Sequence, residues 1–235
     1  MADYTREDIE SMSGKSPLLN RRDLSGLDLS HLDLSGADLR DADLRSTKLI
    51  GANLRNAKLN SAILHDADLS NADLRESDLS SAYLSAANLS NADLTAAILH
   101  TTRLDNAILI GAKLVGVNLC DALLNNSQLD KADIRQANLC AANLRGASLQ
   151  NTQLDNSRMN NVDLRDANLT GASLENVDLS WTDMSSANFS NANLAGANLS
   201  YANLYGANLS NANLHGSDRQ GATIPPKILK QARRK

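Results

Sequence analysis

Residues 192–209 read ANLAGANLSYANLYGANL, a five-residue unit of alanine, asparagine, leucine and two variable residues. The unit extends in both directions without a break, so that a large apolar residue stands at every fifth position from Leu24 to Leu214. A repeat this strict decides the fold, because its large apolar side chains must all reach one interior. The run holds 39 positions, of which 35 are leucine and the others are Ile134, Met159, Met184 and Phe189.

The period of five excludes both a helix and a continuous strand. Five residues at about 100° each rotate the leucine by about 140° per repeat, so a leucine stripe would wander around a helix. Side chains of a strand alternate with period two, and five is odd. A three-residue strand followed by a two-residue corner fits: in residues 92–94 (Ala-Asp-Leu) we expect Ala and Leu to point inward and Asp outward. Corner residues such as Gly111 and Asn126 tolerate left-handed backbone, so the chain is predicted to wind as a solenoid of hydrogen-bonded coils.

The tandem A[DN]LXX unit, unbroken over roughly residues 22 to 224, resembles the signature of the pentapeptide-repeat family. The resemblance implies an all-β fold, a right-handed quadrilateral parallel β-helix of about ten coils with four pentads each. The four sides come from the resemblance, since the period itself gives only the pentad. Many members of this all-leucine type are cyanobacterial, so the resemblance also implies a bacterial, photosynthetic source.

The two ends of the chain depart from the repeat and are predicted to cap it. We divide the chain into an N-terminal cap (1–21), the β-helix (22–224) and a C-terminal capping helix with a basic tail (225–235). Thr5 and Asp8 form a capping-box pattern for a short helix to about Met12. A second helix is predicted after Pro225-Pro226. It would serve either as a cap of the monomer or as the contact of a homodimer. A widened first coil that receives the N-terminal helix is expected from Leu18, Leu19, Leu27 and Leu32.

The charge is divided unevenly along the chain. The segment after Met184 contains six cationic residues and one acidic residue, so its net charge is +5. Since the whole chain carries −4, the rest of the chain carries −9. The acidic body disfavours direct binding of nucleic acid, because it repels phosphates. No signal-like apolar run and no membrane span stand in the sequence, so we expect a cytoplasmic protein.

Outward positions twenty residues apart should stack, and two groups of them break the polar rule. One column holds Ile63, Tyr83, Arg103 and Leu123, and Ile98 and Ile108 are expected on the flanking faces at a similar height. The mid-rod patch (Ile63, Tyr83, Ile98, Ile108 and Leu123) is a candidate protein-binding surface, although scattered surface hydrophobes are common. Trp181, Tyr201 and Tyr205 are candidate anchors for a partner or a dimer, or they cover the rod where the C-terminal helix folds back.

His100, Cys120 and Cys140 should form one outward column, but they do not make a metal site. With neighbours about 5 Å apart, the outer two lie too far apart to share one zinc ion. A disulfide between Cys120 and Cys140 is within reach, and in a reducing cytosol free thiols are favoured. The sequence holds no catalytic motif, and a filled tube lacks the concave site that an enzyme needs. We therefore expect no enzyme, no metal and no cofactor.

Two functions follow from these patterns. The first is a rigid scaffold that binds an unidentified protein partner through its faces. The second, implied by the resemblance, is a DNA mimic that binds and protects gyrase, as some family members do. Leucine instead of phenylalanine at the repeat centre, the lack of an inserted loop and the basic far end all weigh against the second.

Overall fold

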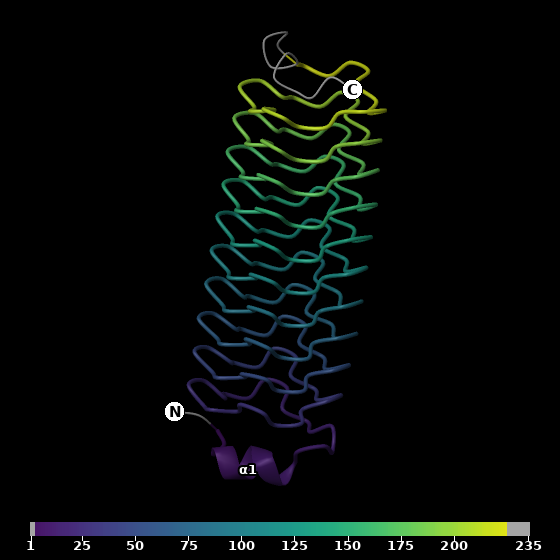
Figure 1. Cartoon of the computed structure of the whole chain (residues 1–235). Coiled ribbons are helices and arrows are strands. Elements are labelled where there is room, and N and C mark those ends of the chain that lie inside the picture. Colours follow the sequence, from purple (N-terminus) through teal and green to yellow (C-terminus); the bar gives the residue numbers. More distant parts are fainter. Residues whose placement is uncertain (1–2, 225–235) are drawn as a thin grey trace.

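The computed structural model describes residues 3–224 and shows a straight tube of stacked coils (Figure 1). Each outward residue forms a parallel bridge with the residue twenty positions later, from Leu18 and Asp38 to Asn203 and Thr223. A spacing of twenty means four pentads per coil, which confirms the right-handed quadrilateral β-helix. Within the described residues the only helix is α1 (Arg6–Ser11), and the walls consist of single-residue bridges rather than longer strands.

The pentad has the expected register. Ala92 and Leu94 are fully buried while Asp93 between them is partly exposed. The N–H of Asp93 donates to the carbonyl of Ala72 at 2.9 Å, and that of Leu94 donates to the carbonyl of Lys113 at 2.7 Å. Each three-residue wall is therefore bonded to the coil before it and to the coil after it, which satisfies the backbone of a buried tube.

Each corner is a tight turn whose second residue is left-handed. The N–H of Ala92 donates to the carbonyl of Leu89 at 3.1 Å, and Asn91 between them has φ 57°. The residue at this position has a positive φ at every corner from Ser16 to Gly221. Positive φ at the third residue is the requirement of a type II turn, so the predicted corner geometry is confirmed.

The interior is a solid column of leucine and alanine. From Leu24 to Leu209 the fifth-position side chains are fully buried, and each contributes about 1.5–3 kcal/mol by leaving water. Most inward serines and threonines donate their hydroxyl proton to a backbone carbonyl: Thr47 Oγ1 donates to the Leu44 carbonyl at 2.7 Å and Thr102 Oγ1 to that of Leu79 at 3.0 Å. The interior is therefore filled, and ligands or partners can reach only the walls, the corners and the ends.

Helix α1 closes the first coil, and its predicted start is confirmed. Thr5 is the N-cap, and its side chain and that of Asp8 form the reciprocal capping box. Ile9 is fully buried against the first coil, and the Arg6 guanidinium donates to the carbonyls of Asp28 and Ser30 at 2.5 and 3.2 Å. The helix thus covers carbonyl groups that the open edge of the first coil would expose.

The predicted first coil needs one correction. Leu19 is fully buried and Leu32 is nearly so, with Leu27 packed partly against the core. Leu18, however, is 75% exposed, because it occupies an outward position and is bridged to Asp38. At the other end, the bridges continue to Thr223 and Ile224 packs against the core.

The predicted C-terminal helix at 225–235 lies outside the described residues. Among residues 3–224, no helix is both long enough and apolar enough to cross a lipid bilayer.

Candidate protein-interaction surface

The twenty-residue coil gives the tube four faces, each a column of outward residues. The chain passes through faces 1, 2, 3 and 4 in turn, so face 1 adjoins faces 2 and 4, which lie opposite each other. We name the faces by their columns: face 1 runs from Asp23 to Asn203, face 2 from Asp28 to Asn208, face 3 from Asp33 to Asn213 and face 4 from Leu18 to Asp218.

Three residues of the predicted mid-rod patch do form one column on face 1. Successive bridges join Ile63 to Tyr83, Tyr83 to Arg103 and Arg103 to Leu123. Ile63, Tyr83 and Leu123 are partly exposed and Arg103 is exposed. We call these four residues the face-1 column. Over four neighbouring coils it replaces the aspartates and asparagines of the other rungs with two aliphatic side chains, one aromatic side chain and one arginine.

The other two patch residues lie on the adjoining faces, as their positions within the coil predict. Ile98 lies on face 4, where it is bridged to Asp78 and Asn118 and is 43% exposed. Ile108 lies on face 2, bridged to Asn88 and Gln128. A corner separates each from Arg103, so the five residues make one column with two isolated apolar residues on the adjoining walls.

Tyr83 is held in place by two neighbours. The guanidinium carbon of Arg103 lies 5.3 Å from the centroid of the Tyr83 ring, a cation–π contact. On the corner between faces 1 and 2, the His65 ring lies 6.1 Å from the Tyr83 ring at an interplanar angle of 48°. His65 occupies an ordinary corner position and breaks no pattern of the repeat, although its separation of 18 from Tyr83 places it on the preceding coil beside face 1.

Trp181 and Tyr201 stack at the corner between faces 4 and 1, as their spacing predicts. Their ring centroids are 4.3 Å apart with planes 12° from parallel, and the side chains are 61% and 46% exposed. Tyr205 is 68% exposed but lies at the next corner, between faces 1 and 2. The structure therefore forms an aromatic pair and a separate tyrosine on the two edges of face 1.

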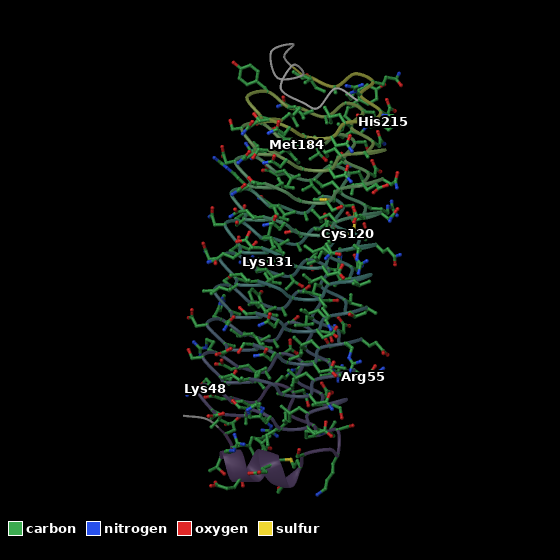
Figure 2. The ribbon with its side chains drawn as sticks, in the orientation of Figure 1. Lys48, Arg55, Cys120, Lys131, Met184 and His215 are labelled. Atoms are coloured by element: carbon green, nitrogen blue, oxygen red, sulfur yellow. A yellow bond between two sulfur atoms is a disulfide. The ribbon has the colours of Figure 1, made fainter. Side chains whose placement is uncertain are left out.

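The expectation of free thiols is wrong. Cys120 and Cys140 form a disulfide, visible near the Cys120 label in Figure 2, and their Cα atoms are 4.8 Å apart. The bond joins neighbouring coils at the corner between faces 4 and 1. His100 stacks below with Nδ1 at 3.0 Å from the Cys120 carbonyl oxygen. Among residues 3–224, no group of three His, Cys, Asp or Glu side chains is placed to hold a metal ion.

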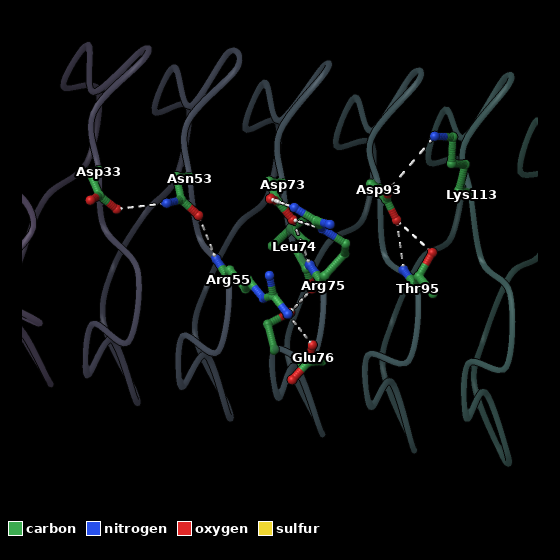
Figure 3. A network of polar contacts seen from close by, with 11 residues as sticks. Asp33, Asn53, Arg55, Asp73, Leu74, Arg75, Glu76, Asp93, Thr95 and Lys113 are labelled. Atoms are coloured by element: carbon green, nitrogen blue, oxygen red, sulfur yellow. Dashed lines mark hydrogen bonds and ion pairs between the residues drawn. The ribbon is translucent and has the colours of Figure 1, made fainter.

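Many acids of the walls are neutralised locally by arginines two residues later. Hydrogen bonds from the Arg75 guanidinium to the carboxylate lower the pKa of Asp73 and raise that of Arg75. On face 3 the same network continues with Lys113 at 3.7 Å from Asp93 and Arg55 at 2.6 Å from Glu76 (Figure 3). Negative charge on this face is thus interrupted at nearly every rung. The Asp–Arg pairs are 38–40, 43–45, 73–75, 133–135 and 163–165.

A shallow hollow of about 490 Å³ lies at the corner between faces 1 and 2 and is lined by Asn125, Asn126, Arg145, Gly146 and Asp166. Arg145 is paired with Asp166 at 3.3 Å, and Asn125 donates to Asp105 at 2.6 Å. The polar groups of the hollow are therefore bonded to their own chain.

The pentapeptide-repeat family model matches this chain in eight copies spread over residues 23–223. HetL, a pentapeptide repeat protein involved in heterocyst differentiation regulation in the cyanobacterium Nostoc sp. strain PCC 7120, is 34% identical. The match covers 92% of this chain and 86% of that one, with a TM-score of 0.44. QnrB1, a plasmid-mediated fluoroquinolone resistance protein, is 19% identical over 87% of this chain and 92% of its own, with a TM-score of 0.45. No curated protein matches the chain. With eight repeat matches and the twenty-residue coil, the chain belongs to the pentapeptide-repeat family.

Proposed function

We propose that this protein is a non-catalytic scaffold that binds a partner protein through the face-1 column. The observation that supports the proposal is the column in which Ile63, Tyr83 and Leu123 occupy three of four successive rungs of one flat wall, with Arg103 between Tyr83 and Leu123. The corresponding positions on most other rungs carry Asp, Asn or another polar residue, which stays hydrated. A contiguous apolar stretch on an otherwise polar surface is typical of a protein-binding site.

The cation–π contact between Arg103 and Tyr83 also supports a protein-binding role of the face-1 column. Tyr83 lies between His65 and Arg103, so its ring is preorganised and loses little side-chain entropy on binding. Tyrosine and arginine are the residue types most enriched among energetically dominant contacts of interfaces. Since no ion pair links Arg103 to an acid among residues 3–224, its charge is available to a carboxylate of the partner.

The charge distribution does not favour the DNA-mimic alternative. A mimic of duplex DNA needs a continuous line of negative charge in place of phosphates. Here arginine pairs with aspartate on several rungs, and face 1 itself carries Arg103 at its centre. We therefore expect no effect of the protein at micromolar concentration on gyrase supercoiling, with or without a quinolone. Inhibition or protection in that assay would favour the mimic.

The scaffold proposal is tested by affinity capture with a variant that keeps the repeat. Ile63→Asn, Tyr83→Asn and Leu123→Asn introduce the residue that Asn143 and Asn203 already provide on face 1, so the fold is expected to persist. The wild-type chain and this triple variant are used as baits in lysate of the source organism. The proposal predicts at least one partner that binds the wild type directly, when both are purified, and that the triple variant loses.

The matched control places three substitutions on the other walls: Gln128→Asn, Ser148→Asn and Gln153→Asn, on faces 2 and 3. This control should retain the partner. If the purified partner binds all three baits with equal affinity, the face-1 column is not the binding surface.

A further inference from the structure

The aromatic pair at the corner between faces 4 and 1 stands in an unfavourable backbone conformation. Trp181 and Tyr201 occupy left-handed corner positions with φ 59° and 58°. A bulky residue at such an angle is an outlier, and glycine or asparagine fills many equivalent positions of this chain. The corner thus combines backbone strain with extensive exposure of both rings.

One face of the indole is open. Tyr201 covers one side of Trp181, and the other side of Tyr201 rests on Gly221, where an added Cβ would come within 2.7 Å of the ring. On its other side Trp181 has only Asn161 as its neighbour in the column, and that short side chain cannot cover an indole. The stack therefore ends at Trp181 with a free aromatic face toward the middle of the rod.

Two carboxylates lie on the two walls that meet at this corner. Asp178 lies on face 4 and Asp183 on face 1, one on each side of the corner. Each uses Oδ1 to accept a backbone N–H two residues on and the amide of the next rung: Asn198 donates to Asp178 at 3.0 Å and Asn203 to Asp183 at 3.1 Å. Among residues 3–224, neither has a cation within ion-pair distance, although Arg158 is on the rung next to Asp178. Arg165 is paired with Asp163 on the rung next to Asp183; hydrogen bonds to Asp163 raise the pKa of Arg165, and the charge of Asp183 raises it further.

We infer that Trp181, together with Asp178 and Asp183, is a binding site for a cationic side chain of a partner protein, an arginine above all. A guanidinium is planar and stacks on an indole, whose ring face is electron-rich, while carboxylates beside the ring bind its N–H groups. A neutral aromatic ring or a sugar could stack on the indole, but it would not pair with the charge of the two carboxylates. The inference deepens the proposed scaffold function by naming the chemistry of a partner at a second site.

The chain itself provides the reporter, because Trp181 is its single tryptophan. The probe is a blocked heptapeptide in which glycine and arginine alternate, titrated into the full-length protein at low ionic strength while indole fluorescence is followed. The matched peptide carries citrulline, which has the shape of arginine without its charge. We expect a saturable change with the arginine peptide, a weaker affinity as salt is added, and no saturation with the citrulline peptide.

Two sets of variants locate the response. The double variant Asp178→Asn/Asp183→Asn keeps the Oδ1 hydrogen-bond acceptors, because Asn198 and Asn203 provide the same acceptor on the next rung. It should weaken binding of the peptide about fivefold, if each lost ion pair contributes as much as a surface ion pair does. The variant Trp181→Asn should fold, because Asn161 has the same left-handed backbone one coil earlier. It should abolish the heat of peptide binding in calorimetry. The triple variant of the face-1 column should bind the peptide as wild type does, so failure of this site and failure of the scaffold proposal are distinguishable.

The chain's own basic residues are controlled in parallel. The titration is repeated on a full-length chain in which Lys227, Lys230, Arg233, Arg234 and Lys235 are glutamine, so that a cation of the same chain cannot mask the site. The inference is overturned if neither chain responds saturably, if citrulline binds as well as arginine, or if the double asparagine variant binds unchanged.

Discussion

At the scale of the residue, the left-handed corner sets the cost of each turn. Most corner residues with positive φ are not glycine, and they include alanines such as Ala86, Ala96 and Ala141. A non-glycine residue in this conformation costs about 1–2 kcal/mol, since Cβ approaches the carbonyl oxygen. The interior leucines offset that cost in every coil.

Replacing Ala96 with glycine should therefore stabilise the protein. Ala96 has φ 60°, and relief of strain should exceed the extra chain entropy of glycine by about 0.5–1 kcal/mol. Ala97→Gly is the matched control: its side chain is buried, so the same change should destabilise. Chemical unfolding of the two variants measures both effects. A shift of the same sign in both would contradict the account of the corner.

Ser157 presents the opposite case, a buried hydroxyl without a hydrogen-bond partner among the described residues. Its equivalent Ser127 donates to the Leu124 carbonyl at 2.8 Å. We predict that Ser157→Ala raises the free energy of unfolding by about 1 kcal/mol, because it removes an unsatisfied polar group, and that Ser127→Ala lowers it slightly. Urea unfolding of the pair checks this, and equal losses would show that Ser157 is hydrogen-bonded in solution.

At the scale of the element, the sequence predicted the pentad and the corner but not every placement. Leu18 was misplaced because apolar character was weighed above register: it has the same phase as the outward Asp23 and Asp43. Ile98 and Ile108 were expected on the walls that flank the Tyr83 column, and the structure places them there.

The disulfide was missed for a different reason. The spacing of twenty already placed Cys120 and Cys140 in neighbouring coils, and an assumption about the redox compartment overrode that geometry. The five-residue period could not predict the number of sides, because the same unit can form a coil of three, four or five sides.

The Cys120–Cys140 disulfide should stabilise two adjacent coils measurably. A cross-link closing a loop of this length contributes about 3 kcal/mol in the chain-entropy account. Reduction is therefore expected to lower the melting temperature of the wild type. The double variant Cys120→Ser/Cys140→Ser should melt at the reduced temperature and not respond to reductant. Detection of two free thiols in the native, unreduced protein would contradict the bond.

The Asp–Arg pairs predict the acid limb of the stability curve. Hydrogen bonds from the arginines lower the pKa of Asp73, Asp133 and Asp163 in the folded state. As the pH falls, the unfolded chain takes up these protons first. The stabilisation is therefore complete above about pH 5 and is lost as pH falls through the lowered pKa values.

Unfolding free energies measured from neutral to acidic pH test this. Replacing Arg75, Arg135 and Arg165 with glutamine should flatten the acid limb. Lys131→Gln should leave it unchanged, because Lys131 forms no ion pair among residues 3–224. An acid limb that is identical in both variants would show that the pairs do not form in solution.

At the scale of the whole molecule, the rod is a stack in which each coil contacts only its neighbours. The face-1 column, the aromatic pair and the disulfide all depend on a coil of twenty residues, since each joins residues twenty apart. Stability should then be close to a sum over coils, and removal of one complete coil should shorten the rod without disrupting the rest.

Deletion of residues 142–161 tests that dependence most directly, because it removes one coil and joins Ala141 to Val162 in register. The remaining chain should unfold cooperatively, keep the circular-dichroism spectrum of the parent and retain the Cys120–Cys140 disulfide. Deletion of residues 142–159 is the control: it brings polar residues to inward positions and should abolish cooperative unfolding. If the two deletions unfold alike, the inward register of the pentads does not hold the rod together.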